Sequence, residues 1–375
     1  MSVSLTAEPL EAIPAGNSAI FSLQLSGQGI PPEKKSIGYR LWSGTGVQLT
    51  ETEQIPYTGA AEDLNVALDI KRKLLSTTLL GYGVSAVTED AEAVKAFYIT
   101  YGEITYNEDE CIQSQDISGV SPTKYGLNAT FPWYIDPASL PGGASIVLSE
   151  RPARVGVYKG QQDWLHIYRH SGVISVTVRG YDSAGNLIVF NTNNQAADKS
   201  VFIFPVGPGN SFFTWNEDIA YYDITVGSWS CRFTLKSCDV SPPNNEIYFQ
   251  EPMGGYSAFR FLNVQGGANT SSQRYRKGKP CSAAFPTLGQ SYGATRYNLQ
   301  SFPGYAMQTE IDYEDGIEQW IEAFFAAENH FMKFQMPDGS YQYQKVNLVD
   351  GAYSTLNNKD VIFLNASFEA HMSRV

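Results

Sequence analysis

EIYFQEPMGGYSAFRF (residues 246–261) alternates apolar and polar side chains on both sides of a Pro-Met-Gly-Gly turn. A period of two predicts two short strands joined by that turn. Ile247 and Phe249 share one face of the first strand, and Phe259 and Phe261 share one face of the second. We therefore predict a β-hairpin whose first role is packing, at the start of the last third of the chain.

One helix is predicted downstream, in DYEDGIEQWIEAFFAAENHF (residues 312–331). Its apolar residues recur with the spacing i, i+3, i+4, i+7 and i+8, which places them in one stripe of a helix. We predict a helix over residues 313–330, with Asp312 as its N-cap, lying across one face of a C-terminal sheet. The stripe consists of Ile317, Trp320, Ile321, Phe324 and Phe325.

The rest of the chain also alternates, which predicts a mainly β, multidomain protein. Residues 1–92 contain AIFSLQLSG (19–27), SIGYRLWSG (36–44) and LNVALDI (64–70), read as strands of an immunoglobulin-like sandwich. The acidic segment TEDAEA (88–93) interrupts this pattern and suggests a boundary. We expect a middle β-sandwich or barrel over residues 93–245, and a β domain with the helix over residues 246–375.

Composition narrows the classes of function. The 375 residues include 26 basic and 38 acidic side chains, for a net charge of -12, which argues against binding nucleic acid through its phosphates. No basic start precedes an apolar run at the N-terminus, and no stretch approaches the roughly 20 apolar residues that cross a bilayer. We expect neither a secretory signal nor membrane insertion.

The four cysteines, Cys111, Cys231, Cys238 and Cys281, form no CxxC pair and no zinc spacing. Cys231 and Cys238 are seven residues apart, so on one strand they would face opposite sides. Buried free thiols are the interpretation we favour, and they fit assembly in a reducing cytoplasm.

Candidate chemistry is sparse in the sequence. His166 and His170 can share one strand face, but no third metal ligand is near, so surface or core histidines are the favoured interpretation. Carboxylates cluster at residues 107–110 and 313–318, where a solvated loop and helix capping explain them better than glycoside hydrolysis does. We predict no catalytic, cofactor-binding or metal-binding residues, and no cofactor.

Aromatic side chains offer one alternative, because Trp and Tyr rings stack on sugars. Trp133, Trp164, Trp215 and Trp229 lie in the middle region. Alternating aromatics in strands are more often core residues. A receptor- or glycan-binding module, with a host glycan as partner, therefore remains the alternative function, followed by an enzyme that acts on surface polysaccharide.

The basic run SSQRYRKGKP (271–280) stands out in an acidic chain and reads as an exposed loop. A solvated loop is the plain interpretation. The functional interpretation is an arm that meets an acidic neighbour, such as another copy of this chain. The predicted interaction residues are Arg274, Arg276, Lys277 and Lys279 from this run, with Tyr248, Met253 and Tyr256 from the hairpin.

The order of these segments resembles virion structural proteins of the tail and baseplate region encoded by phages and prophages of Bacteroidetes bacteria. In that family a hairpin of the type "EIYFLN…GG.D…F" precedes a "W…E…WL…L" helix and a "PV.I.D" strand. Here Gly254-Gly255 and Phe259–Phe261 match the first motif, and Trp320-Ile321 with VNLVD (346–350) match the others. Gln250 and Tyr256 depart from it.

The resemblance implies a non-enzymatic component of a tail, baseplate or neck, which assembles with copies of itself, as a ring-shaped oligomer, and with other virion proteins. It also implies that the protein resides in the virion and is assembled in the cytoplasm of the host bacterium. The distinctive motifs lie in roughly the last third of the chain, although the order of segments spans all of it.

Overall fold

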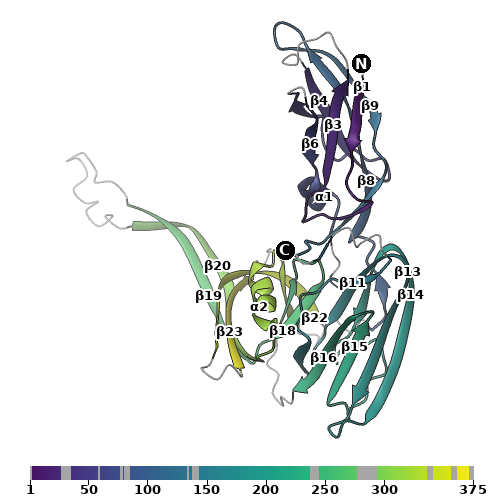
Figure 1. The fold of residues 1–375 in the computed structure, drawn as a ribbon. Coiled ribbons are helices and arrows are strands. Elements are labelled where there is room, and N and C mark those ends of the chain that lie inside the picture. Colours follow the sequence, from purple (N-terminus) through teal and green to yellow (C-terminus); the bar gives the residue numbers. More distant parts are fainter. Residues whose placement is uncertain are drawn as a thin grey trace, which may run out of the picture. The chain divides into compact units, whose positions relative to one another are not determined.

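The structure is a computed structural model that describes residues 2–26, 35–57, 60–76, 79, 85–132, 135–136, 143–236, 245–276, 294–335, 341–355 and 361–370. Strands dominate it and form four sheets, with two short helices (Figure 1). The chain is therefore mainly β and multidomain, as predicted. Among the described residues, no helix is long and apolar enough to span a membrane.

Two sheets enclose the N-terminal core. Phe21 of the first meets Phe97 of the second edge to face, with ring centroids 6.5 Å apart, and Ile70 of a short helix joins the same cluster. The three-stranded sheet has the order β1 (Ser2–Ala7), β3 (Ile20–Ser26) and β6 (Glu62–Asn65). The six-stranded sheet contains β2 (Ala12–Pro14), β10 (Lys124–Leu127), β8 (Val94–Tyr106), β4 (Lys35–Ser43), β5 (Glu53–Pro56) and β9 (Ile112–Val120).

One predicted N-terminal strand is wrong. LNVALDI is a strand only as far as Asn65, and the helix α1 (Ala67–Lys73) follows at once. The Asn65 Oδ1 accepts the backbone N–H of Ala67 at 3.1 Å, which ends the strand and starts the helix. Ala67 and Ile70 are buried three positions apart, as a helix face requires.

The middle sheet has seven strands, and its longest pair, β13 and β14, runs side by side over almost the full length of both strands (Figure 1). From Ile174 to Gly180 every second residue of β13 is buried, including Val176 and Val178, so the intervening residues of this part face outward. The strands are β12 (Arg154–Tyr158), β16 (Trp229–Lys236), β15 (Tyr221–Val226), β13 (Trp164–Tyr181), β14 (Leu187–Pro205), β7 (Thr88–Glu89) and β11 (Ser145–Val147).

The C-terminal sheet begins with the predicted hairpin. Its strands are β17 (Glu246–Gln250) and β18 (Tyr256–Arg260), and Phe249 stacks on Phe259 with centroids 5.4 Å apart. Both faces of both strands are buried, which confirms that the hairpin is a packing unit. The sheet continues with β21 (His330–Gln335), β22 (Tyr341–Thr355), β23 (Val361–Ala370), β20 (Ala294–Asp312) and β19 (Asn263–Arg276).

The turn of this hairpin needs its two glycines. The φ angle of Gly254 is 96°, and a Cβ there would lie 1.8 Å from the carbonyl oxygen of Asn128. A Cβ on Gly255 would lie 2.3 Å from the carbonyl oxygen of Leu148. The backbone of the turn therefore approaches two other segments more closely than any side chain permits.

The predicted helix is α2 (Ile317–Ala326), shorter than residues 313–330. Its N-cap is Gly316, with φ 87°, and not Asp312, because β20 continues through Asp312, which pairs with Val361. Four members of the predicted stripe, Ile317, Trp320, Ile321 and Phe324, are buried, and the fifth, Phe325, is half-buried.

The chain divides into two compact units, each contributed by three segments. The first is Met1–Ser237, Gln250–Ala258 and Glu314–Ala327, and the second is Cys238–Phe249, Phe259–Tyr313 and Glu328–Val375. The turn of the hairpin and helix α2 thus belong to the first unit, although their neighbours in sequence belong to the second. The limits 1–92, 93–245 and 246–375, the immunoglobulin likeness and the packing of α2 on the C-terminal sheet stay predictions.

Candidate functional site

The predicted interaction residues do not form one surface. The side chains of Tyr248, Met253 and Tyr256 are at most 3% exposed, so they belong to the interior. The Tyr248 hydroxyl donates to the Glu246 carboxylate, which also pairs with Lys333 at 2.6 Å. Their aromatic and apolar area therefore supports the core, and the contact surface proposed below does not include them.

The basic residues have a different setting. Arg274 and Arg276 lie on β19, where their backbones pair with Arg296 and Ala294 of β20. Lys277 and Lys279 lie outside the described residues. The structure thus places the start of the basic run at the end of a paired strand, where the sequence predicts a loop.

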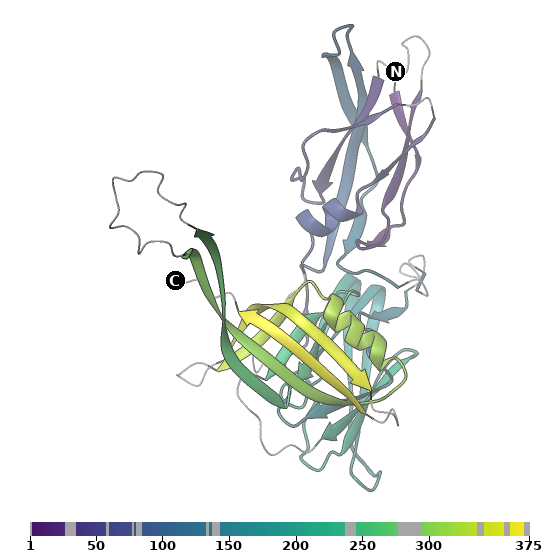
Figure 2. The same cartoon turned by 90° about the vertical axis from the view of Figure 1, so that its left-hand side faces the viewer.

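The pairing of β19 and β20 continues beyond the rest of their sheet. β20 pairs with β23 only over Gly304–Asp312, whereas its pairing with β19 extends from Gln308 to Ala294. In the described part of the chain, residues 268–276 and 294–303 therefore pair with each other and with no third strand. We call this two-stranded segment the ribbon (Figure 2).

The two histidines singled out in the sequence are on β13, and both are buried. The His166 Nδ1 lies 3.3 Å from the backbone nitrogen of Tyr256, and the His170 Nδ1 lies 3.3 Å from the hydroxyl of Tyr168. Over the ranges that the structure describes, no group of three or more His, Cys, Asp or Glu side chains is arranged to hold a metal ion.

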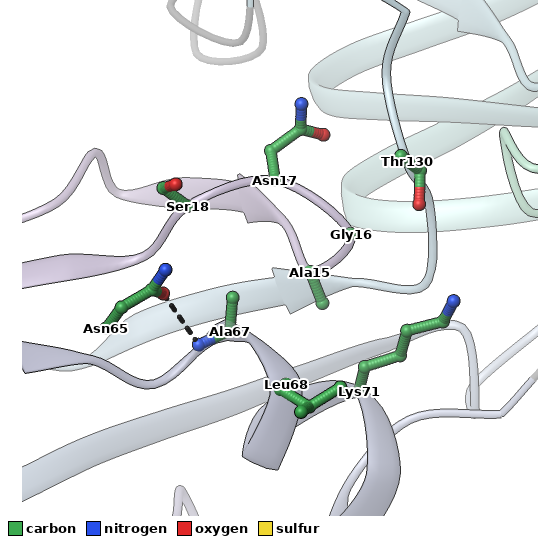
Figure 3. Close-up of a pocket in the computed structure, with 9 residues that line it drawn as sticks. All are labelled: Ala15, Gly16, Asn17, Ser18, Asn65, Ala67, Leu68, Lys71 and Thr130. Carbon is green, nitrogen blue, oxygen red and sulfur yellow. Dashed lines mark hydrogen bonds between the residues drawn. The ribbon is translucent and has the colours of Figure 1, made fainter.

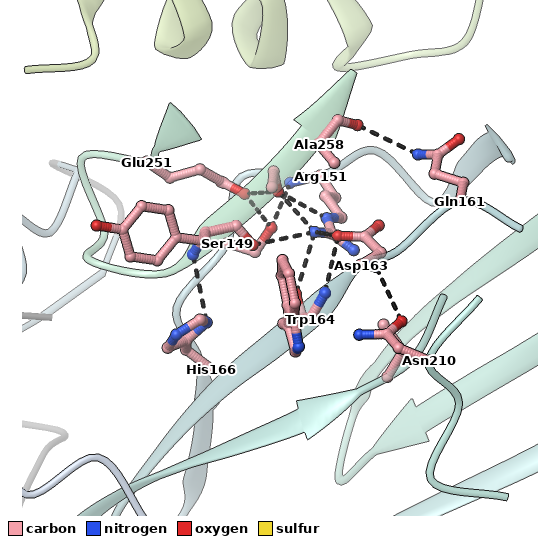
Figure 4. Close-up of polar contacts among 12 residues, drawn as sticks. Ser149, Arg151, Gln161, Asp163, Trp164, His166, Asn210, Glu251 and Ala258 are labelled. Atoms are coloured by element: carbon pink, nitrogen blue, oxygen red, sulfur yellow. Dashed lines mark hydrogen bonds and ion pairs between the residues drawn. The ribbon is translucent and has the colours of Figure 1, made fainter. Parts of the chain in front are cut away.

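A buried polar cluster surrounds Arg151 (Figure 4). Its guanidinium lies 2.6 Å from the Asp163 carboxylate and 2.9 Å from the Ser257 hydroxyl, and it donates to the carbonyl oxygens of Trp164 and Tyr256. Its side chain is fully buried. Through Arg151, the cluster connects Asp163 and Trp164, at the start of β13, with Tyr256 and Ser257 of β18.

Glu251 completes this cluster from the hairpin turn. It accepts a hydrogen bond from the Ser149 hydroxyl at 2.8 Å, one from the Glu150 backbone N–H at 2.5 Å, and one from the Ser257 hydroxyl. Burial, and then the charge of Glu251, raise the pKa of Glu150 to about 7. Burial also raises the pKa of Asp163, more than Arg151 lowers it. The Glu251 carboxylate thus links the hairpin turn to residues 149–150, and its hydrogen bonds account for its burial.

The carboxylate clusters predicted from sequence are separate from these buried groups. Glu108, Asp109 and Glu110 are exposed in a turn whose N–H groups donate to Asn107. Glu314, just before α2, lies 3.7 Å from Arg154, and Arg154 is 60% exposed. The favoured interpretation of the first cluster, a solvated loop, is confirmed.

One open pocket of about 450 Å³ lies beside α1 (Figure 3). The amide of Asn17 is committed to the backbone of Phe131, through both its oxygen and its nitrogen, and Asn65 is committed to Ala67 and Ala19. The lining is Ala15, Gly16, Asn17, Ser18, Asn65, Ala67, Leu68, Lys71 and Thr130. Its amides are therefore structural, and they specify no ligand.

The tryptophans and cysteines are dispersed. Trp164 is buried, Trp215 and Trp229 are half-buried, and Trp133 lies outside the described residues. Cys111 and Cys231 are free thiols, but the prediction that they are buried is confirmed for Cys231 and wrong for Cys111, which is exposed. Cys238 and Cys281 lie outside the described residues. The favoured interpretation, a core residue, is therefore confirmed for Trp164, and the alternative of a sugar-binding platform does not include it.

Sequence reasoning missed a row of arginine and aromatic side chains on the outer face of the middle sheet. Its members are Arg179, Tyr181, Phe190, Tyr221 and Arg232. Period-two counting places Arg179 and Tyr181 on the outward face of one strand, but only the strand register shows which residues stand beside them.

No known protein family matches the chain. No curated protein matches it either. Solved structures with limited similarity to it include chains of two gene transfer agent particles. A chain of the "Virion of native gene transfer agent (GTA) particle" is 8% identical with a TM-score of 0.22, over 34% of this chain and 92% of that one. A chain of the "Tail of empty GTA particle computed with helical refinement, C6 symmetry" is 11% identical with a TM-score of 0.21, over 34% and 90%. TM-scores this low establish no shared fold.

Proposed function

We propose that the chain is a non-enzymatic structural component of a phage virion, in the tail, baseplate or neck, and that it assembles with copies of itself and with other virion proteins. The observation that carries this proposal is the ribbon, which extends beyond its sheet (Figures 1 and 2). The sequence resemblance described above supports the same function.

A two-stranded ribbon is marginally stable by itself in water. Its outer edges also carry backbone N–H and C=O groups that pair with no further strand among the described residues, and proteins usually avoid such open edges. Both properties suit a segment that is completed by another molecule, since a neighbouring chain can add a strand to a free edge. We infer that the ribbon is an assembly arm.

The charge of the arm indicates its neighbour. Residues 263–309 contain five basic residues and no acidic residue, in a chain of net charge -12. A second copy of the chain therefore offers an acidic surface to this basic arm. Opposite charges steer such contacts and fix their register. If each copy binds the next in the same way and the rotation closes, the result is a ring.

The test is a variant that lacks the ribbon and the residues between its two strands. Gly267 and Gly304 are paired neighbours, so joining them through Asn-Gly removes residues 268–303 and leaves the pairing of β20 with β23 in place. We expect this variant to fold, as measured by circular dichroism and melting temperature, and to be absent from purified particles.

A matched control replaces the exposed turn Asp182–Asn186 of the middle sheet with Asn-Gly. This control should enter particles as the unaltered chain does. Normal incorporation of the ribbon-less variant, in a host that makes no unaltered copy, would contradict the proposal.

A further inference from the structure

The outer face of the middle sheet carries an ordered row of side chains. The inward residues Val178, Tyr222 and Phe233 are fully buried, so their neighbours on β13, β15 and β16 point outward. These strands lie side by side with β14 (Figure 1). The outward residues therefore form one solvent-facing surface within the first unit.

Strand register brings five residues of this surface together. Arg179 is opposite Phe190 on one side and Asp223 on the other, and Asp223 is opposite Arg232. Two positions further along β13, Tyr181 is opposite Tyr221. We call this set the arginine-tyrosine strip, and it consists of Arg179, Tyr181, Phe190, Tyr221 and Arg232.

Stacking determines the orientation of the Tyr181 and Tyr221 rings in the strip. The rings of Tyr181 and Tyr221 are stacked with centroids 5.0 Å apart and an interplanar angle of 17°. The Arg232 guanidinium lies 4.4 Å from the centroid of Tyr221. Because stacking occupies one face of each tyrosine ring and Arg232 lies over the Tyr221 ring, the strip offers a ligand the tyrosine hydroxyls, which have no hydrogen-bond partner among the described residues. A donor-rich row of this kind favours an acceptor-rich ligand.

The charged side chains of the strip also favour an acceptor-rich, anionic ligand. Arg232 is neutralised by Asp223, through contacts of 2.7 and 3.0 Å. Asp182 accepts N–H groups from Ala184 and Asn186 within its own turn. Across the described ranges, no carboxylate lies within ion-pairing distance of Arg179. Its guanidinium is therefore the cation of the strip that has no carboxylate partner among the described residues, and it can pair with an anion.

Phe190 adds an apolar element. Its side chain is 61% exposed, with the Arg179 guanidinium 5.9 Å from the ring centroid. Leu187, on the same strand, is 52% exposed. An exposed ring beside a guanidinium can cover the apolar face of a sugar while the cation binds its charged substituent.

We propose that the arginine-tyrosine strip binds an acidic polysaccharide. A sugar carboxylate accepts hydrogen bonds from Arg179 and from the hydroxyls of Tyr181 and Tyr221, and the sugar ring packs on Phe190. The flat surface suits an extended chain. This site is independent of the assembly function proposed above, since it shares no residue with the ribbon.

The experiment measures binding of the full chain to polygalacturonate, alginate and hyaluronate by isothermal titration calorimetry. Dextran serves as the neutral sugar and inorganic polyphosphate as the anion without a sugar. We expect binding to at least one acidic polysaccharide and none to dextran. Polyphosphate binding as tight as that of the polysaccharide, or no binding to any acidic polysaccharide, would overturn the proposal.

Variants then locate the site. Arg179→Gln and Phe190→Ala should each weaken binding about tenfold, as expected for a charge-assisted hydrogen bond and a buried ring. Lys159→Gln removes one charge from a side chain that is 74% exposed elsewhere in the same unit, and should leave binding unchanged. Equal effects of all three variants would indicate general charge attraction and sink the assignment.

Discussion

Arg151 is a buried charge whose partners come from β13 and β18. Replacing it by methionine keeps much of the side-chain volume but leaves the Asp163 carboxylate buried without its cation. We expect Arg151→Met to lower the free energy of unfolding by about 3–5 kcal/mol, the usual result of breaking a buried ion pair from one side. Urea denaturation measures this change.

Arg154→Met is the matched control. Arg154 is 60% exposed and lies 3.7 Å from Glu314, so its loss should change the free energy of unfolding by less than about 1 kcal/mol. The double variant Arg151→Met, Asp163→Leu should recover part of the stability. A loss below about 1 kcal/mol for Arg151→Met would show that the cluster is not a buried network in solution.

Glu150 makes stability depend on pH. Its pKa is raised from 4.5 to about 7 in the folded chain, so between these values the folded state keeps a proton that the unfolded state releases. Its contribution is therefore fully present below pH 4.5 and is lost as the pH rises through about 7. We expect the free energy of unfolding of the unaltered chain to fall, relative to that of Glu150→Gln, from pH 5 to pH 8 in urea titrations. A constant difference between the two proteins would contradict the raised pKa.

At the scale of elements, α2 depends on its apolar stripe. Trp320 is 4% exposed, and its ring lies 6.0 Å from the Arg151 guanidinium. Trp320→Ala should lower the free energy of unfolding by about 3–5 kcal/mol, because it leaves a large cavity. Glu318→Ala, on the exposed side of the same helix, should change it by less than about 0.5 kcal/mol. Similar small losses for both would show that the stripe is not buried in solution.

The ribbon should be the least protected part of its sheet. Residues 304–308 of β20 pair with both β19 and β23, whereas residues 294–303, among the described residues, pair with β19 alone. We expect amide hydrogens of 268–276 and 294–303 to exchange at least about tenfold faster than those of 304–308 in the free chain. Hydrogen exchange with mass spectrometry measures this, and β23 provides an internal reference. Equal protection along β20 would mean that the ribbon is stable without a partner.

Much of this level of structure is predictable from residue patterns. Alternation locates β3, β4 and the hairpin 246–261, and the stripe from Ile317 to Phe324 locates α2, because burial of one face dictates these periods. The start of α2 is not predictable in this way. Asp312 has the residue type of an N-cap, but the sequence does not show that the preceding strand β20 continues through it. The end of β6 is not predictable from alternation either, because the side chain of Asn65 accepts the N–H of Ala67 and starts helix α1 there.

At the scale of the whole molecule, we expect removal of the basic side chains of residues 271–280 to lower incorporation into particles. Changing Arg274, Arg276, Lys277 and Lys279 to serine should leave melting temperature unchanged but lower incorporation into particles severalfold, because opposite charge speeds association. A control with Arg72, Lys73, Lys95 and Lys159 changed to serine removes the same charge elsewhere. Equal incorporation of both variants would count against a specific arm.

Candidate surfaces are harder to predict than elements. Tyr248 and Tyr256 look available in a short hairpin, yet both faces of that hairpin are covered by segments distant in sequence. Arg179 and Arg232 are 53 positions apart in the printed sequence and become members of one strip only through the register of three strands. Side-chain neighbours on adjacent strands depend on the register in which the strands pair, and the residue pattern of a single strand does not specify that register.

The glycine turn at residues 254 and 255 also limits how this protein can evolve. Because the Asn128 and Leu148 carbonyl oxygens occupy the space of any Cβ, no single nucleotide change that adds a side chain at either position is neutral while the fold is kept. The exposed turn Ser183–Gly185 faces no such barrier, apart from the left-handed Gly185. In proteins that descend from this sequence, we therefore expect substitutions to accumulate at residues 183 and 184, whereas Gly254 and Gly255 should stay unchanged.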